Sequence, residues 1–355
     1  MVDSLIKLGK DLEPSWDRES FPQQALKALN NFKVTCSLET FEEQVAQWTL
    51  NVLKLPKQIN LYNTFGEPPI TFFHNGKFAV DVYFWRKNDT NIHSHAFRGA
   101  FKVIYGKSLH EVFHVETLEK FKSDMLNSKL TCLSTQILTA GDSQRILPGM
   151  ELTHRVVHLE NPTLTLCIRT VEDTQLNQWH HLSSGLSYTK YNLKEVNVKQ
   201  ILYFQYMYHS NSLTALKYLN ELLTRMEASA TLSLYESVFA NEFGLDPVVS
   251  DIIIEHINNL CHEELWFQKF INHYDDLAYH LMEFNASSGD LKLLAHGLNF
   301  NFSAESIKNL LGYTENQELQ QLTSKLLEEQ TIFNDEYYGD QVQKINGFMY
   351  KLGDN

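Results

Sequence analysis

Two histidines separated by one residue give the first indication of chemistry in this chain. His93 and His95 lie in the segment that runs from Asn91 to Gly99. On a β-strand, residues i and i+2 point to the same face, so both imidazoles can reach one ion. Neutral imidazole is a ligand for Fe, Zn, Cu, Ni and Mn in proteins. The spacing therefore indicates part of a metal site.

A second segment, from Gly141 to Pro162, supplies the candidate third ligand. A Gly-Asp turn leads a strand, the Pro-Gly turn after Leu147 reverses it, and His154 follows on the next strand. His158 lies four residues further on and would share a face with His154 on one unbroken strand. We expect His154 to be the third ligand. His158 is its rival, or else a group that supports the ligands or contacts the substrate.

Together the two segments resemble the paired motifs of the cupin superfamily. The layout is most similar to the cysteine dioxygenase-like (thiol dioxygenase) branch, over about a third of the chain. The matching features are a strand ending in Trp, an Ile-His-x-His segment, a hairpin that begins at Gly, and a His-Arg-Val segment. They correspond here to Phe78–Trp85, Ile92–His95, Gly106–Glu111 and His154–Val156.

The resemblance implies a three-histidine site made by His93, His95 and His154. The Glu that usually follows the HxH of cupins is absent, because the chain reads Phe-Arg-Gly-Ala from Phe97. The last strand, Leu164–Thr170, also departs from the branch, since it lacks the Ser-x-His-x-Tyr pattern. A site of this kind implies Fe(II) as the cofactor, with Zn, Mn and Ni as alternatives.

Arg169 is a candidate for holding a substrate. It would share a strand face with Thr165 and Cys167. If that face points into the barrel, its guanidinium could bind an anionic group of the substrate bidentately. A plain salt bridge explains the residue equally well. We therefore treat Arg169 and His158 as candidate catalytic residues.

The elements that must position these side chains change in character along the chain. Residues 1–55 predict an N-terminal helical segment, residues 56–175 a cupin barrel, and residues 195–355 a helical C-terminal domain. The expected fold class is α+β, a double-stranded β-helix (jelly-roll) barrel flanked by helices. Glu116–Lys129 reads as a helical or loop insertion between strands. The expected strands are Ile59–Asn63, Ile70–His74, Phe78–Trp85, Phe101–Tyr105, Leu109–Val115, Leu133–Leu138, Ser143–Leu147, Leu152–His158 and Leu164–Thr170.

The composition of the chain limits the kinds of partner that we expect it to bind. The formal net charge of −13 disfavours binding to nucleic acid or to an anionic membrane. No run of eighteen apolar residues is present, so no transmembrane helix is expected. The four cysteines form no CxxC pair, which disfavours a disulfide framework or a thiolate zinc site and fits a cytoplasmic location. We expect a small-molecule substrate, with a homodimer as one possible assembly.

The helical region holds one further constellation. His273, Asp276, His280 and Glu283 fall near one face of a predicted helix, and Glu255 and His262 are seven apart on the preceding one. Carboxylates and histidines on facing helices can build a di-iron site. A solvated polar face is the stronger interpretation.

The leading functional hypothesis is a mononuclear non-haem iron(II) oxygenase or dioxygenase that acts on a small polar molecule. One alternative is a non-redox metal cupin, such as an isomerase, a hydrolase or a sensor. Another is a binding or assembly protein that uses its helical domain. Metal content and oxygen uptake separate the first two, and loss of partner binding on removal of residues 200–355 would favour the third.

Overall fold

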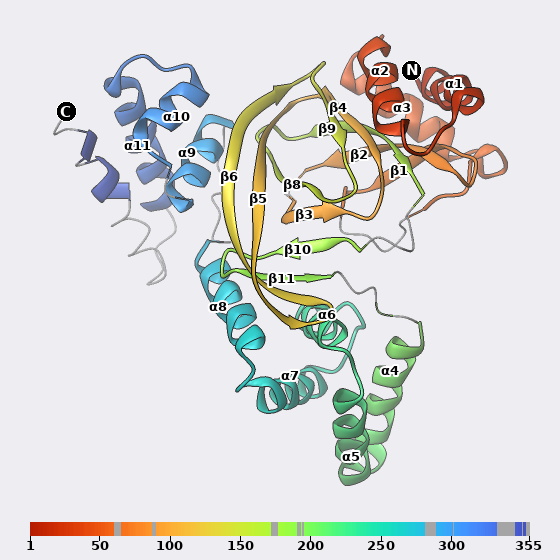
Figure 1. Cartoon of the computed structure of the whole chain (residues 1–355), viewed down its shortest axis with the longest axis vertical. Helices are drawn as coiled ribbons and strands as arrows, with labels where there is room; N and C mark the ends of the chain where they lie inside the picture. The colour runs from red at the N-terminus through yellow and green to blue at the C-terminus, as the bar shows by residue number, and fades with distance from the viewer. Residues whose placement is uncertain are drawn as a thin grey trace.

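The structure is a computed structural model of the 355-residue chain. It describes residues 1–59, 65–86, 90–171, 177–189, 193, 195–280, 289–300, 302–331, 345–349 and 351–352. Two antiparallel sheets form the centre, and helices surround them (Figure 1). In this view α1 to α3 lie beside β1 and β2, α4 to α8 lie below β10 and β11, and α9 to α11 lie beside β6.

The first sheet has five strands in the order β1-β2-β9-β4-β7. Successive side chains along each strand point to opposite faces, so they alternate between two buried environments. Val80, Val82 and Ile168 point outward into a core made with the N-terminal helices. Asp81, Tyr83 and Cys167 point the other way, toward the inside of the barrel. The strands are β1 (Pro69–His74), β2 (Phe78–Trp85), β4 (Gly99–Tyr105), β7 (Ser143–Ile146) and β9 (Thr163–Thr170).

The second sheet closes as a barrel in the order β10-β11-β6-β5-β8-β3. Its longest strands are β5 and β6, which pair along nearly their whole length as one hairpin. The strands are β3 (Ile92–His95), β5 (Lys107–Lys122), β6 (Met125–Thr139), β8 (Gly149–His158), β10 (Trp179–His181) and β11 (Leu186–Thr189). The two sheets together form the expected jelly-roll barrel in an α+β fold.

The N-terminal helices cover the outer face of the five-stranded sheet. Leu5, Phe21, Leu29 and Phe41 come from three helices and pack in one core with the outward side chains of β2, β4 and β9. These elements are α1 (Val2–Leu12), the short 3-10 helix η1 (Glu13–Ser15), α2 (Phe21–Asn31), α3 (Leu38–Thr49) and the 3-10 helix η2 (Val52–Lys54). The helices thus form an outer layer of the barrel fold.

The C-terminal helices make two further cores. Helices α4 (Glu195–Ser210), α5 (Ser212–Thr224), α6 (Ala228–Phe239), α7 (Pro247–Cys261) and α8 (Leu265–His280) pack with Met125, Leu186 and Tyr188 of the barrel. Helices α9 (Gly289–Asn299), α10 (Ala304–Leu311) and α11 (Asn316–Thr331) share a separate core. Leu293 of α9 joins that unit to Leu109 and Val157 on the outside of β5 and β8.

Capping residues set the ends of two C-terminal helices. Asp246 caps α7 by accepting a hydrogen bond from the Val248 amide, with Pro247 at the first helical position. Ser303 caps α10 in the same way, and Gly312 ends that helix with a φ of 73°. In the part of the chain that the structure describes, no helix combines the length and apolar character needed to cross a bilayer.

Other expectations differ from the structure. The insertion expected at Glu116–Lys129 is wrong, because these residues continue β5 and β6 to the tip of their hairpin. Strand pairing also continues beyond residue 175, since β10 pairs with β3 and β11 pairs with β6. The strand expected at Ile59–Asn63 lies, beyond Ile59, outside the described residues.

Candidate metal centre

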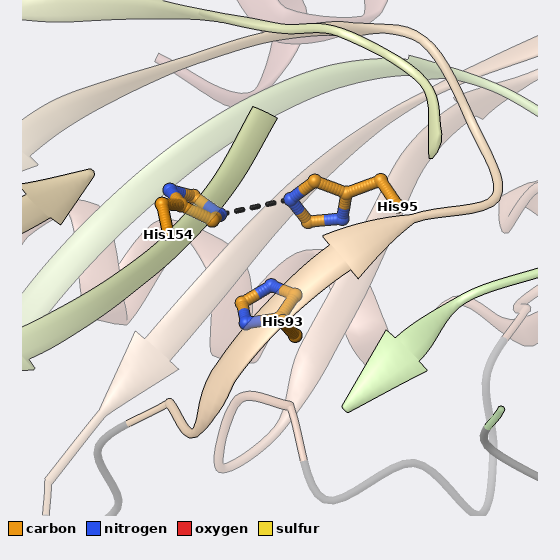
Figure 2. Close-up of side chains that lie close together, drawn as sticks. All are labelled: His93, His95 and His154. Atoms are coloured by element: carbon orange, nitrogen blue, oxygen red, sulfur yellow. Dashed lines mark hydrogen bonds between the residues drawn. The ribbon is translucent and has the colours of Figure 1, made fainter. Parts of the chain in front are cut away.

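The register between β3 and β8 brings the three histidines together. His93 is the cross-strand partner of His154, and His95 follows after an irregularity in the pairing and stands opposite Gly149. Partners across a strand pair share a face, so all three rings point into the barrel. Their candidate ligand nitrogens lie within 4.8 Å of one another, and all three side chains are buried. Figure 2 shows the rings converging, with a dashed line between His95 and His154.

Two rings of the cluster, those of His95 and His154, are held in the uncharged form. Burial, followed by the proximity of His93 and Arg169, holds the pKa of His95 well below its usual range. Burial also lowers the pKa of His154, with further contributions from His93, His95 and His110. The His95 Nε2 and His154 Nε2 atoms are 2.9 Å apart. Neutral imidazole is the form that binds metal, so His95 and His154 can act as ligands without loss of protons.

The donor atoms fit a borderline or transition metal ion. His93 Nδ1–H donates to the Asn91 carbonyl oxygen over 2.7 Å, which leaves the lone pair of this ring on Nε2. His95 Nδ1 is buried without a hydrogen-bond partner, so the ring does not serve a polar network on that side. A set of three imidazole nitrogens suits Fe, Zn, Ni or Cu. An ion held by these three residues would keep coordination positions free for other ligands.

His110 and Gln136 orient His154 from behind. His110 Nε2 lies 2.9 Å from His154 Nδ1, and Gln136 Nε2 lies 3.2 Å from His110 Nδ1. Burial lowers the pKa of His110 to about 4, although Glu111 acts in the opposite direction. If the Gln136 amide group is the donor, His110 donates its N–H to His154, and His154 donates its N–H to His95. With the amide turned over, His154 donates from Nδ1 and keeps its Nε2 lone pair for a metal.

The histidines line a cavity inside the barrel. It offers about 90 Å³ to the centres of water-sized molecules, enough for several waters or one small ligand. The walls are largely aromatic and aliphatic, with a few polar groups, as in many small-molecule sites. The remaining lining residues are Phe65, Tyr83, Trp85, Thr90, Phe97, Phe101, Ile146, Val156, His158, Thr165, Cys167, Arg169 and Gln178.

Arg169 lies on the inward face of β9, as its position in the strand suggested. Its Nε–H donates to Asp81 Oδ2 over 2.9 Å, so the salt bridge considered as the alternative is present. The Nη2 atom, in contrast, is buried without a hydrogen-bond partner. The guanidinium carbon lies 5.2 Å from the centre of the Phe97 ring, and that ring centre lies 4.5 Å from the centre of the His95 ring. Phe97 is thus in contact with both the cation and the histidine cluster.

His158 shares the inward face of β8 with His154 but lies outside the histidine cluster. Its ring stacks on Trp85 with centroids 4.3 Å apart, and its Nδ1 lies 3.0 Å from Ser108 Oγ. Burial, with a smaller effect of Lys292, lowers the pKa of His158 to about 3. The ring is therefore a neutral wall of the cavity, and His154 is the one of the two that lies beside His93 and His95.

The outer faces of β5 and β8 carry a buried triad, which Glu111 and Arg155 form with His296. Arg155 Nε–H donates to Glu111 Oε2 over 2.6 Å. His296 Nε2, from α9, lies 3.1 Å from the same oxygen and 3.2 Å from Arg155 Nη2. The Arg155 guanidinium also lies 3.7 Å from the centre of the Phe300 ring. Sequence spacing gave no signal for this triad, because His296 is far from the strands along the chain.

The helical constellation forms no comparable site among the side chains that the structure describes. Among those side chains, the barrel cluster is the one group of three or more His, Cys, Asp or Glu residues whose ligand atoms converge. His262 is largely exposed, and His273 Nδ1 lies 2.9 Å from Ser183 Oγ at the barrel. The side chains of Asp276, His280 and Glu283 lie outside the described part of the chain.

Comparisons with known proteins find structural similarity over less than half of the chain. No protein-family model and no curated protein matches the chain. A cupin-2 domain containing protein from Shewanella frigidimarina NCIMB 400 shares 14% identity, with 31% of this chain and 86% of that chain covered and a TM-score of 0.21. Hydroquinone 1,2-dioxygenase from Sphingomonas sp. TTNP3 shares 9% identity, with 31% of this chain and 70% of that chain covered and a TM-score of 0.24.

A third similar structure is the DMSP lyase DddQ from Ruegeria pomeroyi DSS-3. It shares 11% identity, with 44% of this chain and 75% of that chain covered, and its TM-score is 0.26. At TM-scores this low, the similarity carries no argument about activity. The jelly-roll description therefore depends on the strand order and the closed barrel of this chain itself, whose inner face carries the histidine cluster.

Proposed function

We propose that this protein binds one Fe(II) ion through His93, His95 and His154 and acts as a mononuclear non-haem iron oxygenase on a small polar molecule. The observation that carries the proposal is the convergence of three buried imidazoles on the wall of one cavity. Bound iron would supply the redox chemistry and the activation of dioxygen, whereas the protein would supply the geometry of the ligands and a partly apolar surrounding.

The chain's own residues have distinct tasks in this proposal. His110 and Gln136 fix the orientation of the His154 ring through their hydrogen-bonded chain. Phe97 and Phe101 cover the histidines with apolar surface, with ring centroids 4.5 Å from His95 and 6.0 Å from His154. Apolar surface beside the rings lowers the local dielectric constant and so strengthens polar contacts there. Arg169 and His158 are the polar wall groups proposed to contact the substrate.

Metal analysis of protein purified without added metal tests the proposal. We expect one iron per chain in the wild type and none in His93→Ala. His114→Ala is the matched control, because His114 is an exposed histidine on β5 outside the cavity, and it should keep the metal. Oxygen uptake is then followed in iron-loaded protein with a panel of small hydroxy-, amino- and mercaptocarboxylates.

The alternative functions predict other results. Zinc, manganese or nickel as the bound metal, with no oxygen uptake by the iron-loaded protein, would overturn the oxygenase proposal in favour of a non-redox enzyme or sensor. Retention of metal by His93→Ala would overturn the site itself. An assembly role would instead appear as partner binding that is lost on removal of residues 200–355 and is unaffected by His93→Ala.

A further inference from the structure

Helix α4 carries apolar side chains on two opposite sides. On its inner side, Ile201 and Phe204 are buried in the core of the C-terminal helices. On its outer side, Val196, Tyr203 and Tyr206 are 56%, 53% and 66% exposed. In Figure 1, α4 and α5 lie at the lower end of the molecule, away from the N-terminal helices. A helix with apolar side chains on both sides is normally covered on both, and the described part of the chain leaves the outer side of α4 uncovered.

The outer side chains of α4 form one stripe along the helix. Val196, Lys199, Tyr203, Tyr206 and Ser210 recur every three or four residues, and all five are exposed. The rings of Tyr203 and Tyr206 stack with centroids 6.1 Å apart, so they form a flat aromatic surface in the middle of the stripe. Lys199 is the one charged member of the stripe. Tyrosine is enriched and charge is depleted at the centre of protein interfaces, so the stripe fits a protein–protein contact.

The stripe is spaced symmetrically about its centre. Lys199 and Ser210 stand at equal distances on either side of the midpoint between Tyr203 and Tyr206. A two-fold contact between identical chains needs a surface that is complementary to itself. We propose that this stripe binds the same stripe of a second copy of the chain, with the two α4 helices antiparallel and the two-fold axis between Tyr203 and Tyr206.

The charges of α4 favour the antiparallel arrangement. Lys199 would stand opposite Ser210 of the second copy, at the C-terminal end of α4, where free carbonyl groups attract a cation. Glu195 would lie beside the first turn of α5 in the second copy, where free amide groups attract an anion. Parallel helices would instead set Lys199 beside Lys199 and lose both contacts.

The exposed apolar area is close to what a dimer needs. Val196 and Leu213 would lie at the two ends of the contact, and Leu213, in the first turn of α5, is 74% exposed. With about 150–250 Å² for a tyrosine, the two tyrosines and these two residues leave roughly 400–500 Å² exposed per copy, a large patch for a monomer. Two copies would therefore bury roughly 800–1,000 Å² through these side chains alone, near the lower limit of a specific interface.

Sedimentation velocity on the full chain tests the proposal. Because an interface of this size is at the weak end, we expect a dissociation constant of about 1–50 µM and follow the protein from about 1 to 500 µM. Tyr206→Glu should weaken association at least about hundredfold, since each dimer contains the change twice and each buried carboxylate costs about tenfold or more. Leu53→Glu is the matched control, because Leu53 is 98% exposed and lies outside the stripe, and it should leave association unchanged.

Cross-linking tests the register, in a Cys132→Ser background that removes an exposed cysteine. A mixture of a Lys199→Cys chain and a Ser210→Cys chain should form a disulfide-linked dimer under mild oxidation, because the two positions face each other across the axis. Lys199→Cys alone should not, since its two copies would stand about 16 Å apart along the helices, beyond the reach of a disulfide. If Tyr206→Glu does not fold, this measurement still decides.

Three results would overturn the proposal: wild type that stays monomeric over the whole range, association that Tyr206→Glu leaves unchanged, or a mixture that cross-links no better than Lys199→Cys alone. A dimer that is lost in Leu53→Glu and kept in Tyr206→Glu would place the contact at another exposed apolar segment and refute it equally. None of these outcomes depends on the metal content, so the oxygenase proposal is tested separately.

Discussion

Glu111 offers a stringent test of how the barrel holds its shape. The side chain is 1% exposed and accepts hydrogen bonds from both Arg155 and His296. Burial alone would raise its pKa, but the His296 contact and the charge of Arg155 outweigh burial and lower the pKa from 4.5 to about 2. Since one pKa unit corresponds to about 1.36 kcal/mol, the folded state favours the carboxylate by about 3 kcal/mol.

The perturbation is Glu111→Gln, which keeps the shape and removes the charge. We expect the free energy of unfolding at pH 7 to fall by about 3 kcal/mol, because Arg155 stays buried without its counter-ion. Urea unfolding followed by fluorescence measures the change. Glu19→Gln is the control, since Glu19 is 75% exposed beside Arg98, and an exposed pair contributes less than about 1 kcal/mol.

The pH dependence gives a second check with a defined sign. The folded pKa lies below the unfolded one, so the stabilisation is fully present above about pH 4.5 and is lost as the pH falls toward about 2. The difference between wild type and Glu111→Gln should begin to shrink below about pH 4.5. A difference under about 1 kcal/mol at pH 7, or one that grows on acidification, would refute the reasoning.

Two further changes probe the site and the sheet. His110→Ala removes the ring behind His154 and should weaken metal affinity about 10- to 100-fold with the fold retained, measured by competition with a fluorescent chelator; unchanged affinity would contradict an orienting role. Gly99→Ala would set a Cβ 2.0 Å from the Ile168 carbonyl oxygen and should lower the free energy of unfolding by at least about 2 kcal/mol, whereas Gly347→Ala, with open space at its Cβ, should be nearly neutral; equal urea midpoints would contradict the clash.

Local patterns predicted the strands that have two distinct faces. Phe78–Trp85 alternates between side chains that meet the N-terminal helices and side chains that enter the barrel, and its bounds agree with β2. Glu116–Lys129 was misread because most of its residues are exposed, so no alternation of burial marks them as strand. The pairing of β5 with β6 determines their conformation, and that information is not local.

In the candidate site, too, local spacing predicts some features and strand pairing determines the others. The spacing of His93 and His95 places two rings on one face without knowledge of the fold. The choice between His154 and His158 needs the register of β3 against β8, which sets His93 opposite His154. His110 gave no signal along the chain, because its contact with His154 arises only when β5 pairs with β8.

The two faces of β8 take part in two different sets of contacts. His154 points inward to the cluster, and its neighbour Arg155 points outward to the triad with His296. A shift of β8 that broke either set of contacts would disturb the other through a single peptide unit. If binding at the cluster shifts β8, it would change how α9 packs, and by reciprocity the packing of α9 would change that binding. The affinity inside the barrel would then depend in part on His296, 141 residues beyond Arg155 along the chain.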